Sequence, residues 1–454
     1  MENVPHILSY YDVLLAPIYF FILLLVVLYW KNKYYSQSPL KKYLLPAFFL
    51  KITCCLLLSF LYEFYYGYSD AHNYFTGVTS IWNAAKINPA YAVEIIFKPI
   101  DKWSLAAEHI GEYMTNPLFS SNIIYMYKIA GFIGLFCFGT YLPIAFIITL
   151  LSFIGSWKIF LVFVEEFPTH YKKIALTCLF APSFIFWSTN IMKDPLCIFG
   201  LGLCFSGFYS ILKKRVTFII ILQMILGVFI MLMLKSYIFY IFLVAAVFGA
   251  YLYIMERFKS VGKAFLRIGV FILASIIAGL VFSQRAYLLE AFSKGFMGEI
   301  FSIQNVQKDT GGSTYTLSNV EDASFLGIIK TYTSSLNVTL FRPYLWEVPN
   351  IIAIANALES FIILFFTIYL LVKLKFIGFF NFAFNNWILG FALIFTLLLA
   401  PLAGLVSFNF GTLVRYKAPL VPFYYTYLVL LYTNQKNHRL KNTLVKPANQ
   451  YKAA

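Results

Sequence analysis

Apolar runs close to 20 residues long recur from one end of this 454-residue chain to the other. An α-helix needs about 20 apolar residues to cross the hydrocarbon core of a bilayer. The chain is also 61% hydrophobic and only 12% charged, which leaves too little polar surface to cover a water-soluble globule of this length. The sequence therefore predicts an all-α fold, a polytopic transmembrane helical bundle that forms a single integral-membrane domain over 1–454.

These runs predict about 11 membrane spans. The first span follows "MENVPHILSYYD", which lacks the basic residues that begin a signal peptide, so we expect it to be retained. The predicted spans lie at 12–29, 43–61, 142–164, 174–191, 195–212, 216–234, 236–255, 268–283, 350–372, 386–406 and 418–433.

Charge placement predicts how the spans are oriented, because lysine and arginine concentrate in cytoplasmic loops. Alternate segments together carry a net charge of +17, which leaves −1 for the rest of the chain out of the total of +16. We therefore expect a multi-pass protein of a bacterial inner (cytoplasmic) membrane, with the N-terminus outside and the C-terminus cytoplasmic. The basic charge then reflects topology and does not indicate a nucleic-acid partner. The segments expected inside are 30–42, 165–173, 213–215, 256–267, 373–385 and the basic tail 434–454.

This topology places two large loops, 62–141 and 284–349, on the outer side. The first loop contains aromatic-rich amphipathic pieces at 81–97 and 103–114 that suit interfacial helices. The apolar stretch 122–138 is expected to be an interfacial or re-entrant helix on this side. If it spanned the bilayer instead, the N-terminus would lie inside and the first basic loop would contradict the charge rule.

The cysteines carry no indication of a metal site. All six lie inside apolar runs and form no CxxC or Cys/His cluster, so we expect them to serve packing. No metal ligands are predicted, and the cofactor is unknown; a divalent metal stays open without any sequence feature that indicates it.

Ionisable residues gather at the predicted outer ends of the spans. Such residues at membrane depth usually face a bundle interior or an aqueous cavity, and they are candidate functional groups. The set consists of Asp70 and His72 in "YGYSDAHNYF", Lys193-Asp194, Lys235, Arg342 and Glu347 in "LFRPYLWEVPN", and Arg415 and Lys417 near the last span.

Lys193 is the strongest candidate for binding a phosphate. Asp194-Pro195 is a typical helix start, in which Asp caps the amides and Pro takes the first helical position. Lys193 would then stand beside a helix N-terminus that favours an anion. Lys235 lies between two predicted spans, where it is either a snorkelling turn residue or a second anion ligand.

The role of Asp70 also has two interpretations. Either Ser69 or Asp70 begins a helix, or the Asp70 carboxylate is a general base at the mouth of an outer cavity. Arg342 and Glu347 are close enough in sequence to pair with each other, and Arg415 and Lys417 could simply anchor the last span. Arginine is the better bidentate phosphate ligand, so Arg342 and Arg415 rank above Lys417.

Three further ionisable residues fall within predicted spans. Glu359 needs a partner at that depth. Lys51 and Lys158 are candidates for burial by their depth, but both could instead snorkel toward the inner surface.

Four stretches carry a resemblance to known proteins: "YYGYSDAHNYF", "PSFIFWSTNIMKD", "LFRPYLWE" and "GTLVRYKAPLVPF". Together they resemble uncharacterised polytopic proteins of the bacterial envelope-polysaccharide type. More loosely, the chain is similar to integral-membrane glycosyltransferases of the GT-C superfamily and to O-antigen polymerases. This resemblance implies a GT-C-like fold and a polyprenyl-(pyro)phosphate-linked saccharide as substrate, handled on the outer face.

The resemblance also implies roles for individual residues. In GT-C enzymes an acidic residue of the first large outer loop serves catalysis, and Asp70 matches that position. The usual paired acidic motif is reduced here to "SDAH". In the polymerases, outer-face arginines bind the lipid phosphate, and Arg342 and Arg415 are the nearest equivalents.

The leading hypothesis is an integral-membrane glycosyltransferase or glycan polymerase that takes sugar from a lipid-linked donor and passes it to a glycan acceptor. Asp70 would be the base, and Lys193, Lys235, Arg342 and Arg415 would hold the donor phosphate. Two alternatives stay open: a transporter or flippase of lipid-linked saccharides, and a non-catalytic membrane protein of an envelope complex.

Overall fold

The computed structural model describes residues 6–67, 69–116, 120–257, 315, 317, 325–348, 351–407 and 409–444. Every regular element in these ranges is a helix. The chain divides into two compact units, unit 1 with residues 1–240 and unit 2 with residues 241–454, and each is described by itself. The boundary falls within helix α11 (Phe218–Arg257).

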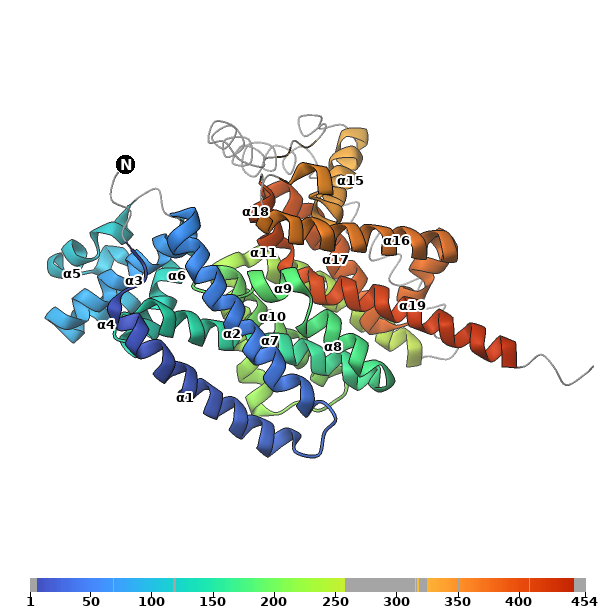
Figure 1. Ribbon diagram of the computed structural model, residues 1–454, viewed down its shortest axis with the longest axis horizontal. Helices are drawn as coiled ribbons and strands as arrows, with labels where there is room; N and C mark the ends of the chain where they lie inside the picture. Colours follow the sequence, from blue (N-terminus) through green and yellow to red (C-terminus); the bar gives the residue numbers. More distant parts are fainter. Residues whose placement is uncertain are drawn as a thin grey trace, which may run out of the picture. The chain divides into compact units, whose positions relative to one another are not determined.

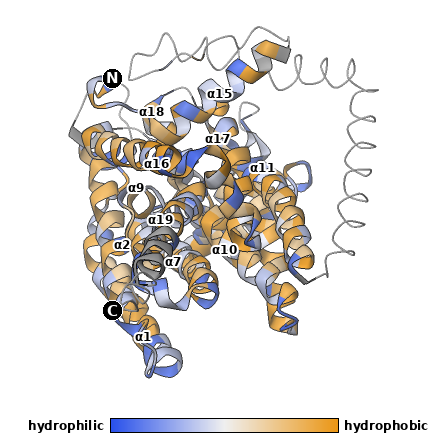
Figure 2. Cartoon of the chain, turned by 90° about the vertical axis from the view of Figure 1, so that its right-hand side faces the viewer, coloured by the Kyte–Doolittle hydropathy of each residue, from blue (hydrophilic) through white to orange (hydrophobic). Residues whose placement is uncertain are grey.

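Seven helices in the described part of the chain are long and apolar enough to cross a membrane. Figure 2 shows hydrophobic residues along most of the length of several of them. The prediction of an all-helical, membrane-type chain is therefore confirmed at that level. The seven are α1 (Tyr10–Tyr35), α2 (Lys41–Leu61), α7 (Tyr141–Glu166), α10 (Lys193–Leu212), α11, α16 (Ile351–Phe384) and α17 (Trp387–Val406).

Two predicted spans, 174–191 and 418–433, differ from expectation. The predicted span 174–191 is not one helix but two short ones, α8 (Tyr171–Leu179) and α9 (Pro182–Trp187), because proline lacks an amide donor and disfavours helix at the residue before it. The stretch 122–138, which was not predicted to span the bilayer, forms the short helix α6 (Ser121–Leu135), whose 15 residues fall short of the ~20 that a perpendicular span needs.

The last predicted span, 418–433, begins as a single 3-10 turn and continues as α19 (Val421–Leu444). This helix is not among the seven described helices that could cross a membrane, because its second half is polar. The predicted span 268–283 and the loop 284–314 lie outside the described residues.

Helices α7 and α10 form the centre of unit 1. They are mostly buried, whereas α1 is mostly exposed. Their backbones meet at Gly155 and Gly202, where a β-carbon built on Gly202 would lie 2.2 Å from the Gly155 carbonyl oxygen. Small residues at such crossings let membrane helices approach closely.

Short helices cover the start of α7 in unit 1. They are α3 (Asp70–Ile87), α4 (Pro89–Phe97), α5 (Leu105–Ile110) and α6, which lie together in Figure 1. The amide oxygen of Asn73 accepts hydrogen bonds from the hydroxyls of Tyr113 and Tyr127, which ties α3 to α6 and to the turn after α5. The two amphipathic pieces predicted in this loop are thus helical.

Unit 2 is built around the buried helix α17. It packs against α15 (Phe325–Phe341), α16, α18 (Phe410–Lys417) and α19. Two long helices of the chain each contain one residue outside helical conformation: Lys235 in α11 (φ −150°, ψ 76°) and Lys375 in α16 (φ 58°, ψ 162°).

Candidate functional site

Lys193 lies where the first turns of three helices of unit 1 meet. It is the first residue of α10, and its half-buried ammonium donates a hydrogen bond to Asn122 Oδ1 at 2.7 Å, at the start of α6. The same Nζ lies 5.7 Å from the centre of the Tyr74 ring on α3. The charges of Asp70, Asp194 and Lys235 all act on it. The structure therefore brings three of the sequence-predicted candidate positions, 70, 193 and 235, into one electrostatic neighbourhood.

Asp194 is not a simple helix cap. The helix begins two residues earlier than the Asp-Pro signature predicts, and the Asp194 carboxylate instead accepts a hydrogen bond from Lys235 Nζ at 2.6 Å. Both side chains are buried, with 7% and 4% of the Lys235 and Asp194 side chains exposed. The snorkelling interpretation of Lys235 is therefore wrong, because its ammonium is enclosed in an ion pair at the break in α11.

This ion pair changes the roles of the three charged residues. The Asp194 carboxylate pairs with Lys235, so it does not form an ion pair with its sequence neighbour Lys193. A phosphate at Lys235 would have to displace a buried carboxylate, which makes Lys193 the better of the two candidates for an anion.

Asp70 is exposed at the first turn of α3, and Ser69 is the N-cap residue of that helix. The Ser69 hydroxyl lies 2.9 Å from His72 Nδ1, which fixes the imidazole beside the helix start. Burial lowers the pKa of His72 below its usual value, so the imidazole is held neutral near pH 7. The helix-start reading of this stretch is confirmed, and the Asp70 carboxylate stays exposed within range of Lys193.

The sequence reasoning missed Asn190, which is fully buried with a left-handed backbone (φ 78°). Its side chain joins three segments: Nδ2 donates to Ser59 Oγ at 3.0 Å, and Oδ1 accepts from Tyr141 at 2.5 Å. Its backbone N–H donates to Thr149 Oγ1 at 3.1 Å. Irregular backbone at membrane depth is tolerated only when it is enclosed in protein in this way. The only available signal was the polar run "STN" after α9.

Further buried polar side chains lie along α2 and α7, namely Lys51, Ser152 and Ser156. Lys51, 3% exposed, donates to Ser156 Oγ at 3.0 Å and lies 5.2 Å from the centre of the Phe184 ring. The buried Ser152 hydroxyl, one turn before Ser156, has no hydrogen-bond partner. Of the two interpretations of Lys51, the buried one is therefore confirmed, and the residue does not snorkel. The other lysine predicted at depth, Lys158, donates to Gln223 at 3.0 Å.

In unit 2, Arg342 and Glu347 pair with each other. Arg342 Nε donates to Glu347 Oε2 at 3.0 Å, and a second guanidinium nitrogen donates to Oε1. The guanidinium also faces aromatic rings of Tyr315, Tyr344 and Phe410 at 5.2–5.8 Å. Burial acts to raise the pKa of Glu347, but the bonds from Arg342 and from the Tyr344 backbone hold it below its usual value.

The remaining candidates also lie in unit 2. Lys417 is buried at the end of α18 and donates to Ser360 Oγ at 3.1 Å, with the charge of Glu359 acting on it. Glu359 accepts a hydrogen bond from Tyr425 at 2.8 Å, which supplies the partner that the sequence required. Arg415 is half-buried in the last turn of α18.

No family model, curated protein or solved structure matches the chain. Within the described residues, no group of three or more His, Cys, Asp or Glu side chains is placed to hold a metal ion. The chemistry of the site therefore rests on its own geometry: a half-buried ammonium at helix starts, a nearby exposed carboxylate, and aromatic rings.

Proposed function

We propose that the protein is an integral-membrane glycosyltransferase or glycan polymerase that uses a polyprenyl-phosphate-linked or -pyrophosphate-linked sugar. The single observation that carries this proposal is the position of Lys193. Its ammonium stands at the N-terminal turn of a 20-residue helix, and Asn122 Oδ1 is its hydrogen-bond partner. An anionic group gains there from both the lysine charge and the helix dipole.

The residues around Lys193 suit one chemical step. The acceptor hydroxyl oxygen forms a bond to the anomeric carbon of the donor, and the bond from that carbon to the phosphate oxygen breaks. Asp70 takes the hydroxyl proton as general base. Lys193 compensates the negative charge on the departing phosphate, which is the electrostatic contribution that usually matters most.

A transfer assay tests this proposal. The purified protein in lipid nanodiscs receives a polyprenyl-phosphate-linked sugar and a glycan acceptor, and product is followed by mass spectrometry. Asp70→Asn is expected to lower kcat by about 100-fold to 10,000-fold, because a positioned general base contributes that much. Asp101→Asn, an exposed carboxylate in the same predicted loop, is the matched control and is expected to keep activity. Full activity in Asp70→Asn would show that Asp70 is not the general base.

In cells, deletion of the gene is expected to change surface glycans and to raise the level of lipid-linked intermediates. Unchanged glycans together with unchanged intermediates would contradict every glycan-related function of this protein.

The broken segment of unit 1 favours a second candidate, a transporter or flippase of lipid-linked saccharides. Discontinuous membrane helices and buried ionisable groups are typical of transporters. Here α8 and α9 replace a continuous span, and Lys51 lies buried in α2 with neutral polar neighbours. Vesicles containing a fluorescent lipid-linked saccharide separate the two functions. A flippase moves the label between leaflets without forming a new glycosidic bond, whereas a transferase forms the bond.

A further inference from the structure

Lys51 is the eleventh of the 21 residues of α2 and so lies at the middle of that helix. Because α2 is long and apolar enough to cross a membrane, Lys51 lies near the depth at which a charged side chain is most costly. Ionisable residues at such a depth are candidate functional groups. The proposed sugar transfer does not use this residue.

In the described part of the chain, the Lys51 side chain contacts no carboxylate. Its partners are the Ser156 hydroxyl on α7, at 3.0 Å, and the Phe184 ring on α9, whose centre lies 5.2 Å away. Helices α1, α7 and α9 pack against α2. No titratable group of their described residues acts on the charge of Lys51, whereas the Cys54 thiol of α2 itself does. The ammonium therefore lacks a counter-charge among these elements.

The other two lysines buried in the described residues differ in this respect. Lys235 pairs with the Asp194 carboxylate, and the charge of Glu359 acts on Lys417. An unpaired ammonium taken out of water costs much free energy, whereas a neutral amine needs only hydrogen bonds. No fixed charge thus holds Lys51 in its protonated form, and a lysine in such surroundings exchanges its proton readily.

A row of polar side chains leads from Lys51 to one end of α2. We call Lys51, Cys55, Ser59 and Glu63 the α2 row; its members are four residues apart, so that each lies one turn beyond the last. Cys55 and Ser59 are fully buried. The Glu63 carboxylate, 4% exposed, bonds the His6 imidazole at 2.6 Å, and the His6 side chain is 86% exposed. The α2 row therefore connects the middle of the helix to water over about 18 Å.

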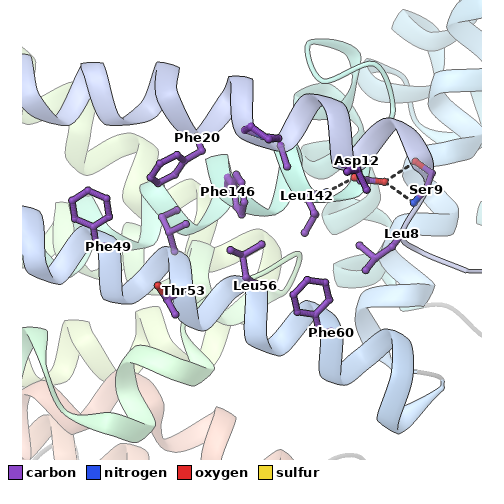
Figure 3. A pocket seen from close by; sticks show the side chains of 14 residues that line it. Leu8, Ser9, Asp12, Phe20, Phe49, Thr53, Leu56, Phe60, Leu142 and Phe146 are labelled. Atoms are coloured by element: carbon purple, nitrogen blue, oxygen red, sulfur yellow. Dashed lines mark hydrogen bonds between the residues drawn. The ribbon is translucent and has the colours of Figure 1, made fainter.

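The side of α2 that faces α1 is mainly apolar. Figure 3 shows Phe49, Thr53, Leu56 and Phe60 of α2 along a crevice beside α1. At 3.6 residues per turn, Lys51 lies about 200° from Phe49 around the helix axis. The polar side chain at the start of the α2 row is therefore turned away from the crevice and toward α7 and α9.

Buried hydroxyl groups on α7 lie beside the α2 row. They belong to Thr149, Ser152 and Ser156. Ser156 contacts Lys51, and Thr149 accepts the N–H of Asn190 at 3.1 Å. Ser152, which lies between them in sequence, has no hydrogen-bond partner for its hydroxyl. Such orphaned buried groups are rare in proteins. A hydroxyl can both donate and accept, so this one is available to a proton that moves between the two helices.

We propose that Lys51 is a proton-binding site in the middle of the membrane, filled from the Glu63 end of α2. The Glu63 carboxyl takes a proton from water and releases it into the helix pair. The thiol and hydroxyl groups in between each accept one proton and release another, and the lone pair of the neutral Lys51 amine takes up the last one to form the ammonium. Release follows the reverse order.

This proton site goes beyond the transfer or flipping of a lipid-linked saccharide and depends on neither. Rows of polar and ionisable side chains carry protons in pumps and transporters. A proton also needs no cavity of its own, which suits a lysine packed against a hydroxyl and an aromatic ring.

Counting bound protons tests the site. The purified full-length protein in nanodiscs is titrated from about pH 9 to about pH 5, and proton uptake is measured with a pH indicator. Wild type is expected to take up about one proton per chain more than Lys51→Met. Lys86→Met, at an exposed position of α3, is the matched control and should match wild type, because an exposed lysine keeps its proton up to about pH 10.4.

Lys51→Arg is a second variant that keeps a charge at this position. Arginine stays protonated over the whole range, so this protein is also expected to take up about one proton fewer than wild type. Thermal unfolding shows which variants are folded. Equal uptake by wild type and a folded variant of Lys51 would overturn the proposal.

The route is tested by a rapid pH jump, in which the Lys51-dependent phase of proton uptake is the one that Lys51→Met lacks. Glu63→Gln is expected to slow this phase by about 100-fold, the lower end of what a positioned proton donor contributes. Glu112→Gln, which removes an exposed carboxylate, is expected to leave it unchanged. Ser152→Ala should slow it without lowering thermal stability, because its hydroxyl has no partner to lose. Unchanged rates in Glu63→Gln and Ser152→Ala would reject the route.

These measurements need no sugar donor, so their outcome is distinct from that of the proposed function. Proton uptake at Lys51 without sugar transfer would reject the transferase and keep the proton site. Sugar transfer without proton uptake at Lys51 would keep the transferase and reject the proton site.

Discussion

Three lysines of unit 1 show how the environment sets the role of one residue type. Lys235 is enclosed with the carboxylate of Asp194, Lys51 is buried against a hydroxyl and an aromatic ring, and Lys193 is half-buried beside an amide oxygen at helix starts. Sequence reasoning placed Lys193 and Lys235 in one class. The structure separates them, because the partner of Lys235 is 41 residues away and no local pattern indicates it.

The buried pair gives a prediction about stability. Removing one member, by Asp194→Leu or Lys235→Met, is expected to lower the free energy of unfolding by about 3–5 kcal/mol, because the charge of the other member stays buried without compensation. The double variant is expected to be more stable than either single one. Thermal unfolding in detergent of the wild type, the two single variants and the double variant measures these differences.

The exposed pair Arg215–Glu165 is the matched control. Removing either of its members is expected to cost less than about 1 kcal/mol, as is usual for surface ion pairs. If the Asp194 and Lys235 single variants unfold like these surface variants, the buried pair does not hold α10 to α11.

Glu347 gives a prediction about pH. Its pKa is lowered in the folded protein by Arg342 and the Tyr344 backbone. A depressed carboxyl pKa contributes stability that is present above the unfolded pKa of ~4.3 and is lost as the pH falls through the folded value. Wild-type protein is therefore expected to lose this stability as the pH falls from about the unfolded pKa of ~4.3 to the lower folded pKa of Glu347, and Glu347→Gln to lose less. Parallel unfolding curves for the two proteins over this range would contradict the prediction.

At the scale of elements, the length and apolar composition of the runs located most long helices. Predicted spans 12–29, 43–61, 142–164 and 195–212 fall within α1, α2, α7 and α10, and 386–406 begins one residue before α17 and ends with it. The span predictions failed where an apolar run continues through a break in the helix. Pro182 divides α8 from α9, and the following segment is held by buried hydrogen bonds to Asn190 that connect residues 41 and more positions apart. Composition alone cannot reveal such tertiary contacts.

The break in α16 gives a prediction at this scale. Lys375 has φ 58° and ψ 162°, a region that is nearly exclusive to glycine because a β-carbon clashes there. Lys375→Gly is expected to raise the free energy of unfolding by about 1 kcal/mol. Lys375→Ala keeps the β-carbon and is the control expected to give no such gain. Equal thermal stability of the two variants would show that the backbone at this position is not strained.

At the scale of the whole molecule, the charge pattern predicts which ends of the helices lie outside. Cysteine labelling tests it, since the six native cysteines are buried or half-buried. Lys102→Cys, exposed in the predicted outer loop, is expected to react with a membrane-impermeant maleimide in intact cells. Gln37→Cys, exposed in the first predicted inner loop, is expected to react only after permeabilisation. The reverse labelling pattern would invert the topology and move Lys193 to the cytoplasmic side.

The candidate site was only partly predictable at this scale. The sequence indicated Lys193 and Asp70 correctly as neighbours of helix starts, and the structure brings their charges within range of each other. It could not indicate the contacts of Asn122, Tyr74 and Asn190, because these join residues that lie far apart in the sequence.

The central claim is that Lys193 binds the phosphate of a membrane lipid. Its most direct test is the affinity of the protein in nanodiscs for a polyprenyl phosphate, compared among wild type, Lys193→Ala and the control Lys86→Ala on the exposed side of α3. Loss of a charge-assisted contact of about 1.5–3 kcal/mol predicts binding weaker by about 10-fold to 150-fold in Lys193→Ala and unchanged in Lys86→Ala. Equal affinity in all three proteins would contradict the account.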